Sequence, residues 1–187
     1  MIGILILASC KKDDDYDLSK DYLPLQVGNY WEFQEWTDSI DNIVKMDGND
    51  YYRVLYRRYN ANSYSDTVYY RKTSNGKVYM RSKFYPEDIL RFDLNAQIGQ
   101  TWEYINTWNL DRPWKVTLQS KIDKIQLGND QIKYCYRYYF DIPISIDDES
   151  CRWLAPGIGF VLESNAQWTS GAYRLTKVRI NGVERQF

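Results

Sequence analysis

The sequence predicts an all-β fold, and three observations support this prediction. Aromatic residues make up 17% of the 187 residues, with 18 tyrosines and 7 tryptophans, and aromatic side chains favour the half-buried surface of a sheet. Strand-like runs alternate with turn signals at roughly the 8–12-residue spacing that is typical of sandwiches and barrels. No run shows a long helical period. We therefore predict an antiparallel meander of about eleven short strands that forms an open barrel or a sandwich.

The first half of the chain shows the alternation clearly. Residues 29–37 predict one strand, which places Trp31 and Phe33 on one face and Glu32 on the other. Trp36 then falls on the face of Glu32. Further strands are expected over residues 51–59, 67–73, 77–85 and 89–93.

The second half repeats this style. Strands are expected over residues 101–108, 114–125, 131–141, 150–154, 160–164, 173–180 and 183–187. Asn-Gly and Asp-Gly pairs tolerate the positive φ angles of tight hairpins, and we expect turns at Asp47-Gly48, Asn75-Gly76 and Asn181-Gly182. The pair at residues 75–76 gives the strongest prediction of a type I′ hairpin.

One segment occurs twice. Residues 23–33 and 94–104 share Leu, Gln, Gly, Trp and Glu at matching positions. We interpret each copy as a device that starts a strand, in which glycine supplies a tight backbone and tryptophan fills the sheet. The repeat predicts two pseudo-symmetric halves of a single domain, and two equivalent ligand sites are the alternative interpretation.

The N-terminal residues carry a targeting signal. Residues 2–8 are apolar, but a run of about seven residues is far shorter than the roughly 20 that span a bilayer. The sequence Leu7-Ala8-Ser9-Cys10 resembles a bacterial lipobox, which implies that Cys10 is lipidated and that residues 1–9 are a signal-peptide remnant. Because no Lys or Arg precedes the apolar run, we expect a longer reading frame upstream. The alternative is a strand followed by a free thiol.

A charged stretch follows this cysteine. Residues 10–21 have no apolar periodicity, and we predict a flexible tether there and a single β domain over residues 22–187. The lysines and aspartates of residues 11–15 resemble the signal that passes Bacteroidetes-type lipoproteins to the cell surface. That resemblance implies an outer-membrane lipoprotein on the cell surface. If the run is only a solvated spacer, the periplasmic face is the alternative.

Two motifs resemble those of uncharacterised Bacteroidetes-type lipoproteins. The first is Leu-Pro-Leu-x-Val-Gly-Asn-x-Trp at residues 23–31, and the second is Trp-x-Ala-x-Gly-x-Gly-x-Val at residues 153–161. The resemblance implies an antiparallel sheet curved into an open barrel or a sandwich. Both motifs are structural, so the resemblance implies no activity and no catalytic residue.

The three cysteines have separate expected roles. If Cys10 carries lipid, Cys135 and Cys151 remain as an even pair in an oxidising compartment. A hairpin that turns near Pro143 would set them opposite each other, so we predict a disulfide between them. Two buried free thiols are the alternative.

Charge and composition exclude several classes of function. Lys plus Arg is 24 and Asp plus Glu is 25, and this balance makes nucleic acid an unsuitable partner. The absence of histidine excludes Ser-His-Asp triads and His-ligated zinc. We predict no cofactor and no metal site. The acidic clusters near residues 38–50 and 147–149 could offer oxygen ligands to calcium, but their spacing matches no defined calcium loop. Catalysis through two carboxylates, as in glycoside hydrolases, stays an alternative with Glu32 and Glu103 as candidates.

The aromatic surplus indicates binding. Flat rings beside polar groups suit a sugar or peptide ligand, although tryptophans that plug the ends of a barrel would look the same. The leading hypothesis is a lipid-anchored, non-enzymatic domain that binds carbohydrate, peptide or a partner protein through an aromatic patch or a barrel mouth. A structural subunit of an envelope complex is the main alternative. The candidate ligand-binding residues are Trp36, Trp108, Trp114 and Trp168, with Asp111 and Arg112 beside them.

Overall fold

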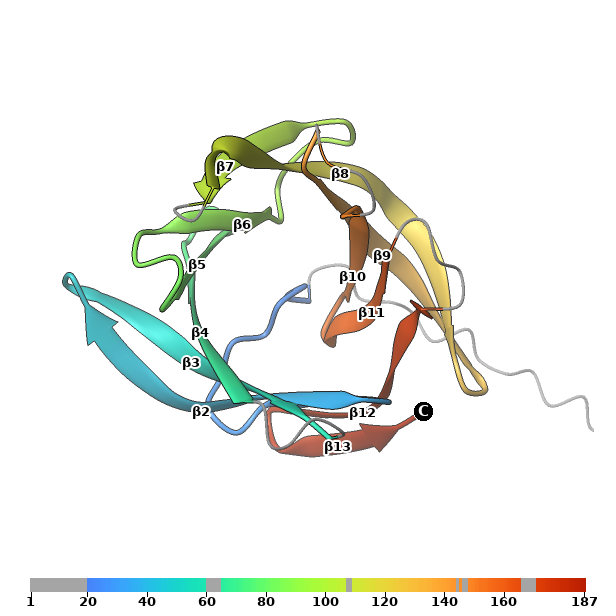
Figure 1. Ribbon diagram of the computed structural model, residues 1–187. Coiled ribbons are helices and arrows are strands. Elements are labelled where there is room, and N and C mark those ends of the chain that lie inside the picture. The colour runs from blue at the N-terminus through green and yellow to red at the C-terminus, as the bar shows by residue number, and fades with distance from the viewer. Residues whose placement is uncertain (1–19, 60–64, 107–108, 144, 146–147, 166–170) are drawn as a thin grey trace, which may run out of the picture.

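The structure is a nearly closed β-barrel of antiparallel strands (Figure 1). It is a computed structural model that describes residues 20–59, 65–106, 109–143, 145, 148–165 and 171–187. The strands are β1 (Tyr30–Phe33), β2 (Trp36–Met46), β3 (Asn49–Arg58), β4 (Ser65–Lys72), β5 (Lys77–Ser82), β6 (Ile89–Asp93), β7 (Thr101–Asn106), β8 (Asn109–Leu127), β9 (Asp130–Asp141), β10 (Ser150–Ala155), β11 (Gly159–Asn165), β12 (Tyr173–Ile180) and β13 (Val183–Gln186). The all-β prediction is confirmed, with a barrel rather than a sandwich. Within the described ranges there is no helix long and apolar enough to cross a membrane.

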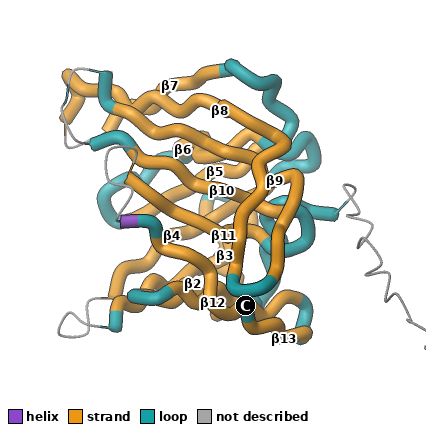
Figure 2. The backbone as a smooth tube through the Cα atoms, turned by 90° about the vertical axis from the view of Figure 1, so that its right-hand side faces the viewer, coloured by secondary structure: helices purple, strands orange, loops and turns teal. Residues whose placement is uncertain are grey.

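The sheet runs as two meanders that meet at β1 and β12. Hydrogen-bonded neighbours follow the order β6-β5-β4-β3-β2-β1-β12-β11-β10-β9-β8-β7, and β13 adds to β12. The two ends of this order, β6 and β7, form a seam that side chains bridge. Trp102 Nε1 donates to the Leu90 carbonyl at 2.8 Å, and Arg91 donates to the Tyr104 hydroxyl at 2.6 Å. Figure 2 shows the barrel wall from the side.

The strand predicted over residues 29–37 is in fact two strands. β1 ends at Phe33 and β2 begins at Trp36, so the chain reverses at residues 34–35. The hairpin turns Trp36 inward, where its ring stacks on Phe33 with a centroid separation of 4.8 Å. The prediction that Trp36 shares the face of Glu32 is therefore wrong, because strand alternation does not continue through a turn.

Tight glycine turns connect several strands. Asp47-Gly48 and Asn181-Gly182 both have two consecutive positive φ angles, as a type I′ turn requires. The hairpin predicted at residues 75–76 is confirmed, but its turn differs in type. Only Gly76 has a positive φ there, and Thr73 N bonds to the Lys77 carbonyl, which is the pattern of a three-residue loop with a bulge.

The internal repeat is a repeated start of a hairpin. Gly28 N donates to the Ile40 carbonyl and Gly99 N donates to the Leu118 carbonyl, each at 2.8 Å. Both glycines have a positive φ, +92° and +85°, that a side chain would strain. The first copy leads into β1 and the second into β7, so each meander starts with the same device.

Residues 20–29 close one end of the barrel. Tyr22 stacks on Tyr136 at 3.8 Å, and Leu23 is fully buried. Asn29 ties this segment to two places, since its side chain donates to the Pro24 carbonyl and accepts from Asn181 N. Figure 1 shows the segment, in blue, running across the ring of strands. We call this side of the barrel, with the short β2–β3, β8–β9 and β12–β13 turns, the closed end.

The opposite side is the open end. An antiparallel meander places alternate strand ends on the same side, so β1, β3, β5, β9 and β11 end there and the connections that follow them start there. Several of these connections are longer than the two-residue turns of the closed end. The last residue of β1 and the first residues of β2 and β12 therefore adjoin the open end.

The two described cysteines are free thiols, so the predicted disulfide is wrong. Cys151 pairs with Tyr139 across β9 and β10, and Cys135 lies farther along β9. The pairing of Ser150 with Phe140 shows that this hairpin turns about two residues beyond Pro143, which moves the thiols out of register. Both are buried, and burial raises the pKa of Cys135 to about 12. They behave as small core groups, as the alternative interpretation predicted.

Candidate functional site

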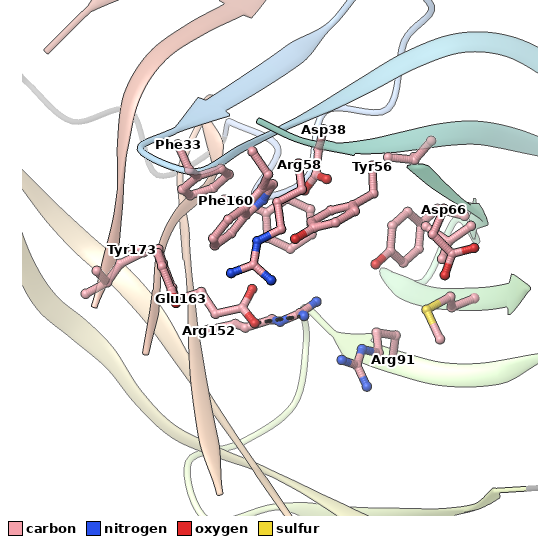
Figure 3. Close-up of a pocket in the computed structure, with 16 residues that line it drawn as sticks. Phe33, Asp38, Tyr56, Arg58, Asp66, Arg91, Arg152, Phe160, Glu163 and Tyr173 are labelled. Carbon is pink, nitrogen blue, oxygen red and sulfur yellow. Dashed lines mark hydrogen bonds and ion pairs between the residues drawn. The ribbon is translucent and has the colours of Figure 1, made fainter. Parts of the chain in front are cut away.

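The open end of the barrel contains a cavity of about 400 Å³. It lies inside the barrel, and inward-facing side chains of nine strands line it (Figure 3). The lining residues are Phe33, Trp36, Asp38, Val54, Tyr56, Arg58, Asp66, Val68, Tyr70, Met80, Arg91, Arg152, Phe160, Leu162, Glu163 and Tyr173. This volume falls in the lower part of the range for small-molecule sites in proteins.

Aromatic rings form one wall of the cavity. Trp36 stacks on Phe33 and meets the ring of Tyr173 edge-on at 4.7 Å. Tyr56 adds a third neighbour at 5.9 Å from Trp36. These rings come from the ends of β1, β2, β3 and β12 that adjoin the open end, so the β1–β2 reversal builds this wall. The packed rings present an apolar surface to the cavity.

The floor of the cavity separates it from the closed end. Phe160 lies at this level, and its ring meets Trp31 edge-on at 5.9 Å. Trp31 is 1% exposed and donates its indole N–H to the Ile158 carbonyl at 2.5 Å. The buried ring of Tyr70 stands beside Phe160 at 6.5 Å. The barrel is thus a packed core below this level and an open cavity above it.

An ion pair crosses the cavity wall between β10 and β11. Arg152 and Glu163 are directly opposite each other in the register, and their side chains approach to 3.1 Å. Burial opposes the charge of Arg152, but Glu163, Tyr70 and Asp38 together raise the pKa of its guanidinium. Arg152 therefore stays a cation deep in the barrel.

Asp38 is the carboxylate whose protonation the cavity alters most. Burial raises the pKa of Asp38 to about 7, and the charge of Glu163 adds to this effect while Arg152 opposes it. Its side chain lines the cavity beside Trp36. Asp38 therefore gains or loses its proton near neutral pH, which makes the charge of the cavity sensitive to pH.

Two further arginines complete the charged set. Arg58 lies near the rim, where it donates to Glu35 at 2.8 Å. Arg91 comes from β6 on the far side, and its guanidinium carbon lies 4.2 Å from the centre of the Phe140 ring. Figure 3 shows Arg58 and Arg152 close to Glu163, with Arg91 at the edge of the group.

The candidate ligand-binding residues divide into three groups. Trp36 lines the cavity but is only 6% exposed, so it forms part of a wall and not of an exposed patch. Trp114 is half-buried and stacks on Tyr104 at 6.3 Å, away from the cavity lining. The remaining candidates, Trp108, Trp168 and the side chains of Asp111 and Arg112, lie outside the described residues, as does the lipidation candidate Cys10.

The carboxylates proposed for hydrolysis do not share a site. Glu32 lies on the outer face of β1, because its neighbours Trp31 and Phe33 point inward. Glu103 is exposed on β7, which stands at the far end of the strand order. No group of three or more Cys, Asp or Glu side chains in the described part of the chain could hold a metal ion.

Four charged residues of the cavity, Asp38, Arg91, Arg152 and Glu163, were not predicted from the sequence as ligand-binding residues. They lie on β2, β6, β10 and β11, so no local motif joins them. One signal was available, since a charged residue at an inward-facing position interrupts the alternation of a strand. Asp38 stands two residues from the buried Trp36 and two from the buried Ile40 and shows this interruption, whereas Arg91 gives no such signal because it falls where the β5–β6 register shifts.

Comparisons with known proteins give a general likeness in fold. No protein-family model matches the chain, and no curated protein matches its sequence. A predicted exported protein with a YmcC-like fold from Bacteroides fragilis aligns with a TM-score of 0.49 at 12% identity, covering 86% of this chain and 99% of that one. A predicted lipoprotein from Parabacteroides distasonis aligns with a TM-score of 0.41 at 13% identity over the same shares. Neither likeness identifies a function for this chain.

Proposed function

We propose that this chain is a lipid-anchored, extracytoplasmic binding protein that takes a small ligand into the open end of its barrel. One observation carries the proposal: the cavity of about 400 Å³, which is lined by both aromatic rings and charged groups. Ligand sites in proteins combine an apolar wall with a few convergent polar groups in this way. The ligand we expect is a carbohydrate or a peptide, or one end of a larger molecule.

The anchor rests on the sequence. Leu7-Ala8-Ser9-Cys10 resembles a lipobox, and the charged run that follows resembles a signal for export to the cell surface. Each buried methylene of an acyl chain contributes about 0.8 kcal/mol, so a multiply acylated cysteine holds a protein at a membrane without further contacts. We infer an outer-membrane location, with the barrel at the cell surface.

The aromatic wall favours binding for a physical reason. Trp36, Phe33 and Tyr173 are already packed against one another, so they lose little conformational freedom when a ligand contacts them. A flat sugar ring or a side chain of a peptide gains apolar contact on such a surface. The nearby carboxylates and guanidinium groups can then fix its orientation through hydrogen bonds.

A glycan and peptide array tests the proposal. The full chain should bind a small set of ligands, and Tyr56→Ala should weaken this binding about tenfold or more, because Tyr56 lines the cavity. Tyr69→Ala is the matched control, since Tyr69 follows Val68 on β4 and points to the outer face. An equal loss in both variants, or a loss in the control alone, would contradict a site inside the barrel.

The anchor has a separate test. Palmitate labelling of cells should mark the wild-type protein, and Cys10→Ala should abolish both the label and the partitioning into membranes. Unchanged membrane partitioning of the Cys10→Ala protein would contradict lipid anchoring. This result would leave the cavity proposal intact.

A further inference from the structure

We propose that the ligand is an organic acid whose carboxylate lies between Arg91 and Arg152 and whose body lies against the aromatic wall. This inference rests on the proposed function and specifies the chemistry of the ligand. Uronic acid sugars and small aromatic acids share this chemistry, and the two sources are separated by the test below.

The two guanidinium groups converge on one buried ring. Phe140 on β9 is fully buried, and the guanidinium carbon of Arg91 lies 4.2 Å from its centre. The guanidinium carbon of Arg152 lies 5.9 Å from the same centre. Arg91 reaches this ring from β6 and Arg152 reaches it from β10, and both arginines also line the cavity, so two cations from separate halves of the chain belong to the same site.

Arg91 has hydrogen-bonding capacity to spare. A guanidinium carries five N–H donors, and among the described residues Arg91 donates to the Tyr104 hydroxyl and forms no ion pair with a carboxylate. Its Nε and the Nε of Arg152 are buried without a hydrogen-bond partner within the described ranges. An unneutralised cation in a half-buried site is costly, and an oxyanion that accepts its donors removes this cost.

The carboxylates of the cavity leave room for an added negative charge. Glu163 pairs with Arg152, and Arg58 pairs with Glu35 at the rim. Burial raises the pKa of Asp38 to about 7, so below neutral pH this carboxyl is largely uncharged. Asp66 lines the cavity from the start of β4. The side occupied by Arg91 is thus the part of the cavity where an anion is best accommodated.

The aromatic wall determines the rest of the ligand. Phe33, Trp36 and Tyr173 line the cavity and offer an apolar surface beside its charged groups. A guanidinium fork matches a carboxylate with two parallel hydrogen bonds, whereas a ring-shaped body suits the stacked aromatics. A carboxylate on a ring therefore suits both the charged and the aromatic groups of the cavity.

The test compares two pairs of probes in which a carboxylate is replaced by a neutral polar group. In ¹⁹F NMR titrations of the full chain, 4-fluorophenylacetate should bind at least about tenfold more tightly than 4-fluorophenylacetamide. Glucuronate and glucose, used as competitors of the fluorinated acid, form the sugar pair. Displacement by glucuronate but not by glucose indicates a sugar acid, and displacement by neither indicates an aromatic acid.

Three variants test the inference through the direction in which the affinity for the acid changes. A residue with only a structural role would not strengthen binding when it is replaced. Arg91→Met should weaken binding of the acid about tenfold or more and leave the amide unchanged. Glu163→Gln should strengthen binding of the acid severalfold, because it removes a negative charge and frees Arg152. Arg57→Met, on the exposed end of β3, is the control and should have no effect. The gain expected for Glu163→Gln keeps the test informative if Arg91→Met folds poorly.

Two outcomes would overturn the inference. If the acid and the amide bind equally well, the cavity binds ligands without selecting anions, and the proposed function still holds. If the wild-type chain and Glu163→Gln bind neither probe, the inference fails, while the array with Tyr56→Ala remains the separate test of binding in the cavity.

Discussion

The two ends of this barrel are built from the same strands, yet they differ in the length of their turns, in their packing and in the charge of the residues inside them. At the closed end, turns are short and residues 20–29 fill the space, so that Leu23 and Trp31 are almost completely buried. At the open end, connections are longer, and Asp38 and Arg152 line a cavity where a core would otherwise continue. The difference indicates that the closed end supplies stability and that the open end is available for binding.

Two tryptophans illustrate this division. Trp31 satisfies its indole N–H with a backbone carbonyl and packs into the floor. Trp36, only five residues later, sits at the other end and presents its stacked ring to the cavity. One short strand and a turn separate a residue that stabilises the fold from one that shapes the site.

The largest expected effect is at the closed end. Trp31→Ala should lower the free energy of unfolding by about 3–5 kcal/mol, because it opens a cavity in the core and leaves the Ile158 carbonyl without its donor. Trp102→Ala, at the matching position of the repeat, should cost clearly less since Trp102 is only partly buried. Urea unfolding of both variants measures the difference. Equal losses would contradict the contrast between the two copies.

A glycine pair tests the same end of the barrel. A methyl group on Gly159 would lie 2.8 Å from the Trp31 indole nitrogen, and its φ of +90° is already unfavourable for a side chain. Gly159→Ala should cost about 2–4 kcal/mol, from a steric clash and backbone strain together. Gly182→Ala has a similar φ of +81° with open space around it, so it should cost only about 1 kcal/mol. Similar unfolding midpoints for the two variants would show that the floor around Trp31 is loosely packed.

The third prediction concerns the open end and its pH dependence. Burial raises the pKa of Asp38 from its ordinary value near 4 to about 7, so the folded state favours the neutral carboxyl. Stability should therefore decrease as pH rises from about 4 to 7 and then level off, with a contribution from Asp38 on the order of 4 kcal/mol for a rise of about three pKa units. Asp38→Asn should remove this contribution, so the variant gains stability over the wild type as pH increases. Urea unfolding at pH 5 and pH 8 checks this, and a constant difference between the two proteins would contradict it.

The fold could be predicted from the sequence much better than the site. Alternating residues and Asp-Gly or Asn-Gly turns are local signals, and they predicted most strands and the turn at Asn181-Gly182. The break between Phe33 and Trp36 was missed because residues 34–35 carry neither glycine nor proline. The hairpin between β9 and β10 was placed two residues too early, and this small error was enough to predict a disulfide that the register forbids.

The cavity could not be predicted in the same way. Arg91 and Arg152 line the same cavity only because the closed sheet brings β6 and β10 to it. Their separation in the sequence hides this arrangement, and strand order is a property of the whole barrel. The alternation of residues along the sequence thus predicts the strands of the barrel wall. Which side chains line the cavity depends on the order in which those strands pair when the barrel closes.

The smallest expected effect concerns the buried thiols. In the Cys10→Ala chain, a reducing agent should leave the unfolding temperature unchanged, because Cys135 and Cys151 are free and out of register. Both thiols should react with a thiol reagent only after unfolding, since both are buried. A decrease of several degrees on reduction would indicate a disulfide and a different pairing of β9 with β10.

The central claim is that ligands enter the open end and leave the closed end unchanged. The indole N–H signals of the tryptophans report on both ends in one ¹H–¹⁵N NMR spectrum, recorded during titration with 4-fluorophenylacetate or with the tightest ligand from the array. The claim predicts that the Trp36 signal shifts with ligand concentration while the Trp31 signal, held by the Ile158 carbonyl, stays in place. A spectrum in which Trp31 shifts and Trp36 does not would contradict it.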